Sequence, residues 1–337
     1  MVTRRLLLGG AAATIAGASW PVRSATGMLR RLRIGTLRPV SSAPLFLGHE
    51  LGYFADLGFE SELVFFDAAQ PIAVAAASGD IDLGCCAFTG GLFNLAGNRA
   101  LTVVAGGSPE APGYPLVGYL AGRPAHEAGL KTLRDFPGRT VGITQIGSSY
   151  HYSMHLLARK HGFDLAQVRL QPLQSLSNMA AALTGGRIDA TLLPTTLVPD
   201  LLQSGAARLL GWVGDETPWQ MCGVFVSAKA AADRENVGRI LHAYRRGCET
   251  YAASLLAKRV DGIVPLDAET RPLLDLLAKH ARLPPEQLAK TLPFIRADGR
   301  LALDSVQDQI DWMAGSGLVT ERFAVRDIVD TGYGYIV

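Results

Sequence analysis

The feature that most constrains the fold of this chain is an internal repeat at a fixed offset of 107 residues. The matching pairs are Gly35 and Gly142, Ser41 and Ser148, Ser42 and Ser149, Leu63 and Leu170, Gly79 and Gly186, Ile81 and Ile188, Asp82 and Asp189, and Thr89 and Thr196. Turns of this kind occur in any α/β protein, but one spacing shared over so long a span indicates duplication of a structural unit. The sequence therefore predicts two similar lobes.

Each copy alternates short β-branched runs with alanine- and leucine-rich stretches, which is typical of an α/β fold with a mainly parallel sheet. The elements predicted for the first copy are strands over 32–37, 59–65 and 81–85, and helices over 43–54 and 68–77. Glycines that suit left-handed helix caps follow the second helix of each copy, at Gly79 and at Gly185 or Gly186. Asp82 and Asp189 then open strands.

The chain must cross from the first lobe to the second and return. We predict an outgoing strand over 115–121 and a returning strand over 223–227. The remaining sequence contains no third copy and most simply packs on lobe one, with helices over 230–256, 269–280, 285–292 and 305–315. These boundaries assign 30–117 and 226–337 to lobe one, and 118–225 to lobe two. Two crossovers form a hinge, and lobes around a hinge can close on a ligand.

The first residues have the order of an export signal. Arg4 and Arg5 precede an apolar run over 6–18, which is shorter than the roughly 20 residues of a membrane-spanning helix. This order is typical of a signal peptide, and the paired arginines resemble a twin-arginine signal. Cleavage after Ala18 or after Ser24 both fit, and an apolar cytosolic N-terminus is the alternative. We assign 1–24 as the signal and expect a periplasmic mature chain.

Charge and cysteine usage exclude other classes of function. The chain has 32 basic and 30 acidic residues, and no basic run follows the signal, so we expect no binding to nucleic acid. Four cysteines, Cys85, Cys86, Cys222 and Cys248, are too few for a disulfide framework in so long a chain. One bridge among them remains open, but buried free thiols are the simpler expectation.

The ends of the strands predict where a ligand binds. In open α/β sheets, ligands bind beyond the carboxyl ends of the strands, where helix N-termini also point. The loops there are 38–42 and 87–91 in the first copy, and 145–151 and 194–196 in the second. The two lobes should therefore present matched surfaces to each other.

A Ser-Ser pair stands in one such loop of each copy. Serine hydroxyls at a helix start either cap the helix or donate to a ligand, and the helix start itself favours an anion. We expect Ser41 and Ser42 to face Ser148 and Ser149 across a cleft. Two such starts predict a site for a carboxylate or a sulfonate, with plain capping as the alternative.

Other residues of these loops supply charge, shape or neutral hydrogen bonds. Arg38 either pairs with the anion or is a solvated loop residue. Aromatic rings there either enclose an organic ligand or pack in a core. The full predicted ligand-binding set is Arg38, Ser41, Ser42, Phe88, Thr89, Ser148, Ser149, Tyr150, Thr195, Trp219 and Gln220, and Thr196 is a further candidate. We expect no catalytic residue, no metal and no cofactor.

Taken together, these segments resemble the periplasmic substrate-binding proteins of nitrate, taurine and aliphatic-sulfonate importers. That group includes binders of the thiamine pyrimidine precursor and of some aromatic acids. The matching segments, over roughly 33–228, are IGTLRPVSSAPLFLGHELGYFADLGFESELV, SGDIDLG, TLRDFPGRTVGITQIGSSYHYSMHLLARKHGFDLAQV and ALTGGRIDATLLP. Ser148 and Ser149 match the Gly-Ser-Ser helix start that contacts anionic ligands in the sulfonate binders.

The resemblance implies a type II periplasmic-binding-protein fold, with two similar α/β lobes, a two-strand hinge and C-terminal helices packed on lobe one. It also implies delivery of the ligand to an ABC permease in the inner membrane. We expect a monomer that captures a small organic anion, and three aromatic rings favour a sulfonate or an aromatic carboxylate over nitrate. A thiamine pyrimidine precursor as ligand, or a sensor as receiver, is the alternative.

Enzymes and regulators fit less well. Tyr152 follows His151 where a zinc protease has its glutamate, so the pair His151 and His155 does not complete H-E-x-x-H. The Gly-Ser-Ser segment is not the G-x-S-x-G of hydrolases. The pair Cys85-Cys86 does not reproduce the cysteine cluster of pyrimidine-precursor synthases, which share the fold. Transcription factors with such lobes carry a helix-turn-helix where this chain has its predicted export signal.

Overall fold

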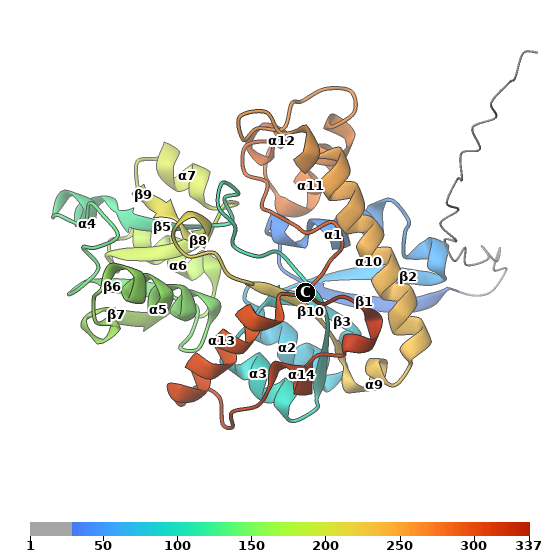
Figure 1. The fold of residues 1–337 in the computed structure, drawn as a ribbon. Helices are drawn as coiled ribbons and strands as arrows, with labels where there is room; N and C mark the ends of the chain where they lie inside the picture. The colour runs from blue at the N-terminus through green and yellow to red at the C-terminus, as the bar shows by residue number, and fades with distance from the viewer. Residues whose placement is uncertain (1–28) are drawn as a thin grey trace, which may run out of the picture.

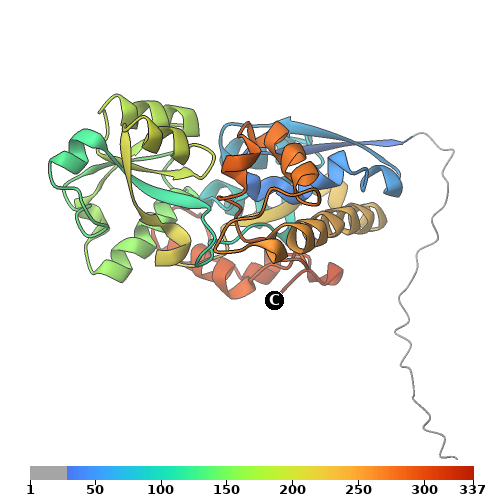
Figure 2. The same cartoon turned by 90° about the horizontal axis from the view of Figure 1, so that it is seen from above.

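The computed structural model describes residues 29–337, and the predicted export signal over 1–24 lies outside the described residues. The described chain forms two α/β lobes, each built on its own five-stranded sheet. Figure 1 shows the two lobes beside each other, and the view from above in Figure 2 separates lobe two, green to yellow, from lobe one. The prediction of two lobes is confirmed.

The sheet of lobe one has the strand order β2-β1-β3-β10-β4. Its strands are β1 (Arg30–Thr36), β2 (Phe59–Phe65), β3 (Leu83–Ala87), β4 (Leu101–Gly106) and β10 (Cys222–Ser227). Its helices in this part of the chain are α1 (Ala43–Glu50), α2 (Ala69–Ser78) and α3 (Gly90–Gly97). Strands β1, β2 and β3 pair in parallel, whereas β10 is antiparallel to both of its neighbours. The predicted helix over 43–54 ends earlier, because the chain turns at Gly52 with a φ of 74°.

The sheet of lobe two has the corresponding order, β7-β6-β8-β5-β9. Its strands are β5 (Val117–Gly122), β6 (Thr140–Ile143), β7 (Arg169–Pro172), β8 (Ala190–Pro194) and β9 (Ala207–Trp212). Its helices are α4 (Arg123–Glu127), α5 (Ser149–His161), α6 (Leu176–Thr184), α7 (Val198–Gln203) and α8 (Val213–Glu216). The antiparallel strand is now β5, so each sheet receives its antiparallel strand from a crossover between the lobes.

The pairing register repeats along with the strand order. Ile34 lies opposite Leu63 in lobe one, and Val141 lies opposite Leu170 in lobe two, 107 residues later in both strands. A register is specified by which face of each strand is buried. The repeat in the sequence is therefore a repeat of the sheet itself.

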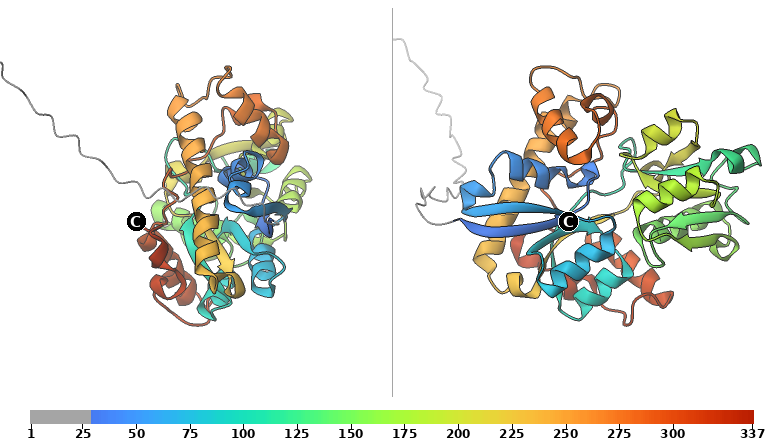
Figure 3. Two further views of the ribbon diagram at one scale, coloured as in Figure 1. Left: turned by 90° about the vertical axis from the view of Figure 1, so that its right-hand side faces the viewer. Right: turned by 180° about the vertical axis from the view of Figure 1, so that it is seen from behind.

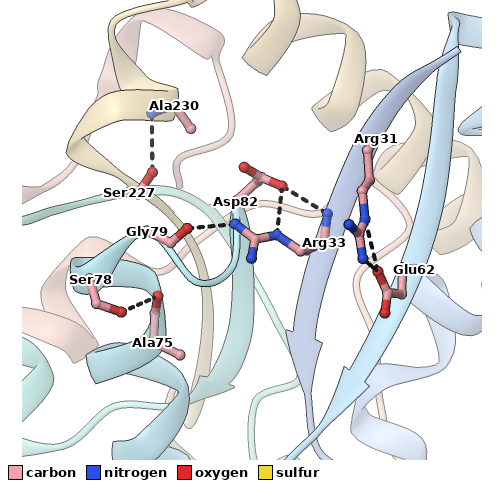
Figure 4. Close-up of polar contacts among 9 residues, drawn as sticks. All are labelled: Arg31, Arg33, Glu62, Ala75, Ser78, Gly79, Asp82, Ser227 and Ala230. Atoms are coloured by element: carbon pink, nitrogen blue, oxygen red, sulfur yellow. Dashed lines mark hydrogen bonds and ion pairs between the residues drawn. The ribbon is translucent and has the colours of Figure 1, made fainter. Parts of the chain in front are cut away.

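The Ile-Asp motif of each copy ties the third strand to the first. The Asp82 carboxylate accepts a hydrogen bond from the backbone N–H of Arg33 at 2.8 Å, as Figure 4 shows. The Asp189 carboxylate accepts one from the N–H of Thr140 at 2.7 Å. Both aspartates therefore hold a strand start in place, in the same way in both lobes.

The repeated glycines make room for the isoleucine of the same motif. A Cβ at Gly35 would lie 2.3 Å from the Ile81 Cδ1 atom, and a Cβ at Gly142 would lie 2.6 Å from the Ile188 Cδ1 atom. Side chains at these two positions would clash with a fully packed core. The caps predicted after the helices are at Gly79 and Gly186, which have positive φ angles of 81° and 66°.

Two extended crossovers connect the lobes, one between β4 and β5 and the other between β9 and β10. They pair with each other where the Glu110 N–H donates to the Trp219 carbonyl at 2.8 Å and the Trp219 N–H donates back at 3.2 Å. The strands predicted over 115–121 and 223–227 lie mostly inside the sheets, as β5 and β10, because a strand that enters a sheet satisfies its backbone on both edges.

The C-terminal helices cover lobe one, as predicted. Helices α10 (Arg234–Ser254), α11 (Arg271–Ala281) and α12 (Pro285–Leu288) pack on the side of α1, whereas α13 (Leu303–Gly315) and α14 (Val325–Ile328) lie near α3. Figure 3 shows both groups from behind. The predicted helix over 230–256 divides into α9 (Ala228–Ala231) and α10, because the Asp233 side chain caps α10 by accepting from the Asn236 N–H.

No helix between residues 29 and 337 has both the length and the apolar character that a membrane crossing requires.

Candidate functional site

A pocket with an empty volume of about 580 Å³, its open mouth included, lies between the two lobes. It lies beyond the carboxyl ends of β1, β3, β6 and β8, where the sheet rule predicts a ligand site. The lining residues are Leu37, Pro39, Ser41, Ser42, Ala68, Ala69, Cys85, Cys86, Ala87, Leu116, Val117, Thr144, Ser149, Tyr150, Leu176, Pro194, Met221 and Cys222. None of these side chains is charged.

Two backbone hydrogen bonds join the lobes beside this pocket. The Gly90 N–H at the start of α3 donates to the Gly147 carbonyl at 2.9 Å, and the Leu176 N–H donates to the Asp67 carbonyl at 3.5 Å. Leu176 itself lines the pocket. The structure therefore shows the lobes in contact around the site.

In lobe one, the serine pair precedes α1 in a short 3-10 turn over Val40–Ser42. The Ser42 hydroxyl accepts a hydrogen bond from the Thr36 hydroxyl at 2.6 Å. Within residues 29–337 the Ser41 hydroxyl makes no hydrogen bond, and neither serine side chain caps the helix. The residue that a Ser41 cap would need is Pro44, which has no N–H. The Ser41 hydroxyl is thus left for the pocket.

In lobe two, the serine pair begins α5 directly. The Ser148 hydroxyl accepts from the His151 N–H at 3.3 Å and caps the helix. The Ser149 hydroxyl has no hydrogen-bond partner in the described part of the chain, although the residue is 6 % exposed and lines the pocket. One serine of this pair therefore serves the helix, and the other faces the site.

Two further hydroxyls complete the polar part of the pocket. Tyr150 and Thr144 both line it, and neither hydroxyl has a hydrogen-bond partner among residues 29–337. Burial raises the pKa of the Tyr150 phenol far above its ordinary value, so that it remains a hydrogen-bond donor. The site thus has neutral donors from two helix starts.

Several predicted site residues lie away from the pocket. Phe88 is fully buried and stacks on Phe93 with 5.3 Å between ring centroids. Thr89 caps α3 by accepting from the Leu92 N–H at 3.0 Å. Thr195 is buried beside the pocket-lining Pro194, but it is not itself part of the lining. These residues occupy core and cap positions, because successive side chains at the end of a strand point alternately towards the cleft and towards the interior.

Arg38 also points elsewhere. Its guanidinium lies 4.2 Å from the centre of the Phe65 ring and donates to the His280 carbonyl at 3.4 Å. It therefore packs against the side of α11 and does not line the pocket.

The two predicted crossover residues hold the hinge in place. The Gln220 amide donates to the carbonyls of Gly107 and Cys222 at 3.0 and 2.8 Å, which ties one crossover to the other. The Trp219 ring packs edge-on against Tyr152 of α5 at 4.9 Å. Nearby, burial raises the pKa of the Glu110 carboxyl well above its ordinary value.

The pocket also has a sulfur-bearing part that was not predicted from the sequence, and it consists of Cys85, Cys86, Met221 and Cys222. The four cysteines of the chain are free and buried, as the sequence indicated. The available signal was that Cys85-Cys86 ends a strand and Met221-Cys222 follows the return crossover. Because these segments are far apart in the sequence, only the fold brings them together.

His151 and His155 of α5 pack against α13 instead of forming part of the pocket. The His151 Nδ1 atom accepts from the Gly147 N–H at 3.1 Å, and its ring meets the Trp312 ring edge-on at 5.0 Å. His155 stacks on the same ring at 4.7 Å. Burial lowers the pKa of His151 to about 4. Among residues 29–337, no group of three or more histidine, cysteine or acidic residues is arranged to hold a metal ion.

Two similar α/β lobes, paired crossovers and a pocket between the lobes at the strand ends define the periplasmic-binding-protein fold. The predicted fold class is therefore confirmed. The chain belongs to the NMT1/THI5 like family, which it matches over residues 40–254.

Solved structures with this fold cover most of the chain. The alkanesulfonate-binding protein of Xanthomonas axonopodis pv. citri, bound to MOPS, is 22% identical with a TM-score of 0.72, over 90% of this chain and 99% of that one. The aliphatic sulphonate binding protein of Escherichia coli is 20% identical with a TM-score of 0.66, over 89% and 92%. The nitrate-binding protein of Synechocystis PCC 6803 is 12% identical with a TM-score of 0.61, over 77% and 69%. No curated protein matches the sequence.

Proposed function

We propose that this protein is the extracytoplasmic solute-binding subunit of an ABC importer and captures a small organic anion, a sulfonate or an aromatic carboxylate. In this role it is exported with residues 1–24 as its signal, works as a monomer and delivers its ligand to a permease in the inner membrane. It carries out no reaction. The fold supports this role, because solved relatives with it include sulfonate- and nitrate-binding proteins.

The observation that carries the proposal is a pair of unpaired hydroxyls from two facing helix starts. Ser41 precedes α1 in lobe one and Ser149 begins α5 in lobe two, and both line the same pocket. Unpaired N–H groups and partial positive charge make helix starts favourable for anions. An anion between the lobes would contact both lobes and so favour the closed form.

The lining also limits the charge of the ligand. Because no cationic side chain among residues 29–337 lines the pocket, the anion must be held by neutral donors, namely Ser41, Thr144, Ser149 and Tyr150. Neutral hydrogen bonds and helix starts compensate a single charge better than several. A ligand with one acidic group therefore fits best.

A second candidate is an uncharged pyrimidine, of the kind expected from the family resemblance. The same neutral lining favours it, since a heterocycle can accept hydrogen bonds from the free hydroxyls without any counter-charge.

A thermal-shift screen of the mature protein tests the proposal. The ligands are sulfonates, aromatic carboxylates, nitrate, taurine and pyrimidines, each at two concentrations. Capture by the folded state should raise the melting temperature in a concentration-dependent way, with a sulfonate or an aromatic carboxylate giving the largest shift. Stabilisation by pyrimidines alone would select the second candidate, and no stabilisation by any anion would contradict the first. Neighbouring permease and ATPase genes would distinguish an importer from a sensor.

A further inference from the structure

Four residues with sulfur-bearing side chains line the pocket on the side of lobe one, and we call them the sulfur wall. Cys85 and Cys86 come from β3, and Met221 and Cys222 come from the end of the return crossover and the start of β10. These strands are neighbours, because Gly223 pairs with Cys86 and Cys222 pairs with Ala87. The wall therefore belongs to the sheet of lobe one and to the crossover that feeds it. The hydroxyls, in contrast, come from the helix starts and the loop after β6.

These thiols are uncharged in the folded protein. Burial raises the pKa of Cys85 to about 12, and it raises the pKa values of Cys86 and Cys222 well above the ordinary value. The Cys86 thiol makes one weak contact, with the Ala69 carbonyl at 3.5 Å. Neutral thiols and a thioether form a polarisable, water-poor surface that ionic groups avoid.

Such a surface discriminates among organic ligands of equal size by their aromatic character and their charge. The polarisable sulfur of a methionine makes favourable contacts with aromatic rings, and a saturated ring makes no contact of this kind. In the described part of the chain the lining also contains no carboxylate, so an ammonium group on the ligand would be buried without a counter-charge. A second acidic group would likewise find no cation.

We propose that the sulfur wall of Cys85, Cys86, Met221 and Cys222 selects a ligand with one acidic group on an uncharged aromatic ring. The proposal rests on the proposed function and narrows it. The hydroxyls of the helix starts hold the acidic group, and the wall holds the ring. Aminosulfonates of the taurine type and aliphatic sulfonates are then weaker ligands.

Isothermal titration calorimetry with matched ligands on the mature wild-type protein tests this specificity. Benzenesulfonate and cyclohexanesulfonate share one head group and a similar volume, so their ratio reports the preference for the aromatic ring. We expect benzenesulfonate to bind about 3- to 10-fold more tightly. Ethanesulfonate against taurine reports the effect of an ammonium group, and we expect taurine to bind at least about tenfold more weakly.

Variants then assign the preference to the wall. Met221→Leu with Cys222→Ala removes two sulfur atoms and leaves the lining apolar, and we expect the aromatic preference to fall below about twofold. Affinity for cyclohexanesulfonate should fall by a smaller factor than affinity for benzenesulfonate, because a saturated ring loses packing contacts but no sulfur–aromatic contact. Cys248→Ala is the matched control, because Cys248 is a buried thiol of α10 outside the pocket. If the double variant unfolds, Met221→Leu alone serves, since the change conserves volume.

The outcomes separate this inference from the proposed function. Equal affinity for the two cyclic sulfonates, or an unchanged preference in the variant, would overturn the role of the wall while the capture of anions stands. If no sulfonate or carboxylate binds at all, the proposed function fails and the inference fails with it.

Discussion

The two lobes share their framework and differ at the helix start that faces the pocket. The strand register and the aspartate at each strand start repeat at the offset of 107 residues. At the third position after the first serine, however, lobe one has Pro44 and lobe two has His151. Of these two residues, only His151 has a backbone N–H that can donate to the hydroxyl of a capping serine.

The four serines have different roles in the two lobes. In lobe two, Ser148 caps its own helix and leaves Ser149 free. In lobe one, Ser41 has no N–H to cap, and the Ser42 hydroxyl accepts from the Thr36 hydroxyl. Each lobe thereby contributes one unpaired serine hydroxyl to the pocket, but from a different position of the pair. Duplication preserved the residues that hold the sheet together and reassigned the hydroxyls at its edge.

Removing one free hydroxyl from each lobe should have the largest effect on binding. A hydrogen bond to a charged group contributes about 1.5–3 kcal/mol, so Ser41→Ala with Ser149→Ala should weaken the affinity for the best anionic ligand by about 100-fold or more. Calorimetry on folded protein measures the change. An affinity within threefold of wild type would mean that these serines do not hold the ligand.

The capping serine is the matched control for that experiment. Ser148→Ala removes a cap and should lower the free energy of unfolding by about 1 kcal/mol, while affinity changes by less than about threefold. Ser227→Ala removes the cap of α9 in the same way, because the Ser227 hydroxyl accepts from the Ala230 N–H at 3.1 Å (Figure 4). Ser227 is not part of the pocket lining. If Ser148→Ala weakened binding as much as Ser149→Ala, the division of roles between the serines would be wrong.

Removing the aspartate that holds a strand start should destabilise either lobe. Asp82→Ala and Asp189→Ala each leave a strand-start N–H without its carboxylate, and we expect each to lower the free energy of unfolding by about 1–3 kcal/mol. Urea denaturation measures both variants, and the corresponding asparagine variants, which keep an acceptor oxygen, should lose less. A large loss for one aspartate and none for the other would show that the lobes are not equivalent at this point.

The histidine of lobe two should give the smallest effect, and it depends on pH. Burial lowers the pKa of His151 from 6.5 to about 4, so the unfolded chain binds this proton more readily than the folded one. The stability due to neutral His151 is therefore complete above pH 6.5 and is lost as the pH falls towards 4, by about 1–2 kcal/mol.

Melting curves between pH 4 and pH 8 test this dependence. His151→Gln should lose less stability than wild type on acidification, because the variant has no group to protonate at this position. His242→Gln, at an exposed position on α10, is the control and should follow wild type. Parallel curves for wild type and His151→Gln would show that this histidine does not couple folding to pH.

Much of the architecture could be predicted from the sequence because its signals are local or periodic. The strand over 59–65 follows from alternation, and the matched copies follow from spacing. A glycine after each helix predicted the left-handed caps, at Gly79 and at Gly185 or Gly186, and the structure places the positive φ angles at Gly79 and Gly186. The positions of Ser41 and Ser149 at the pocket followed from the strand-end rule, and their binding of a ligand stays a prediction. The exchange of Pro44 for His151 was visible too, and it was the available signal for which serine is free.

Other parts of the site depended on packing that no local pattern encodes. Phe88 and Trp219 are aromatic loop residues by sequence, yet one ring stacks on Phe93 in the core and the other packs on Tyr152 at the hinge. The direction of a side chain at a strand end depends on which neighbours arrive from elsewhere in the chain.

By itself, the sequence determined a doubled α/β framework and the serine pairs at the ends of its strands, because spacing and helix capping act within a few residues or at a constant offset. The tertiary structure alone decided which hydroxyls reach the pocket, and it alone assembled the wall of Cys85, Cys86, Met221 and Cys222. Those contacts join segments more than a hundred residues apart. Strand pairing within the sheet of lobe one and the packing of the two lobes, rather than local preference, therefore decide which atoms meet.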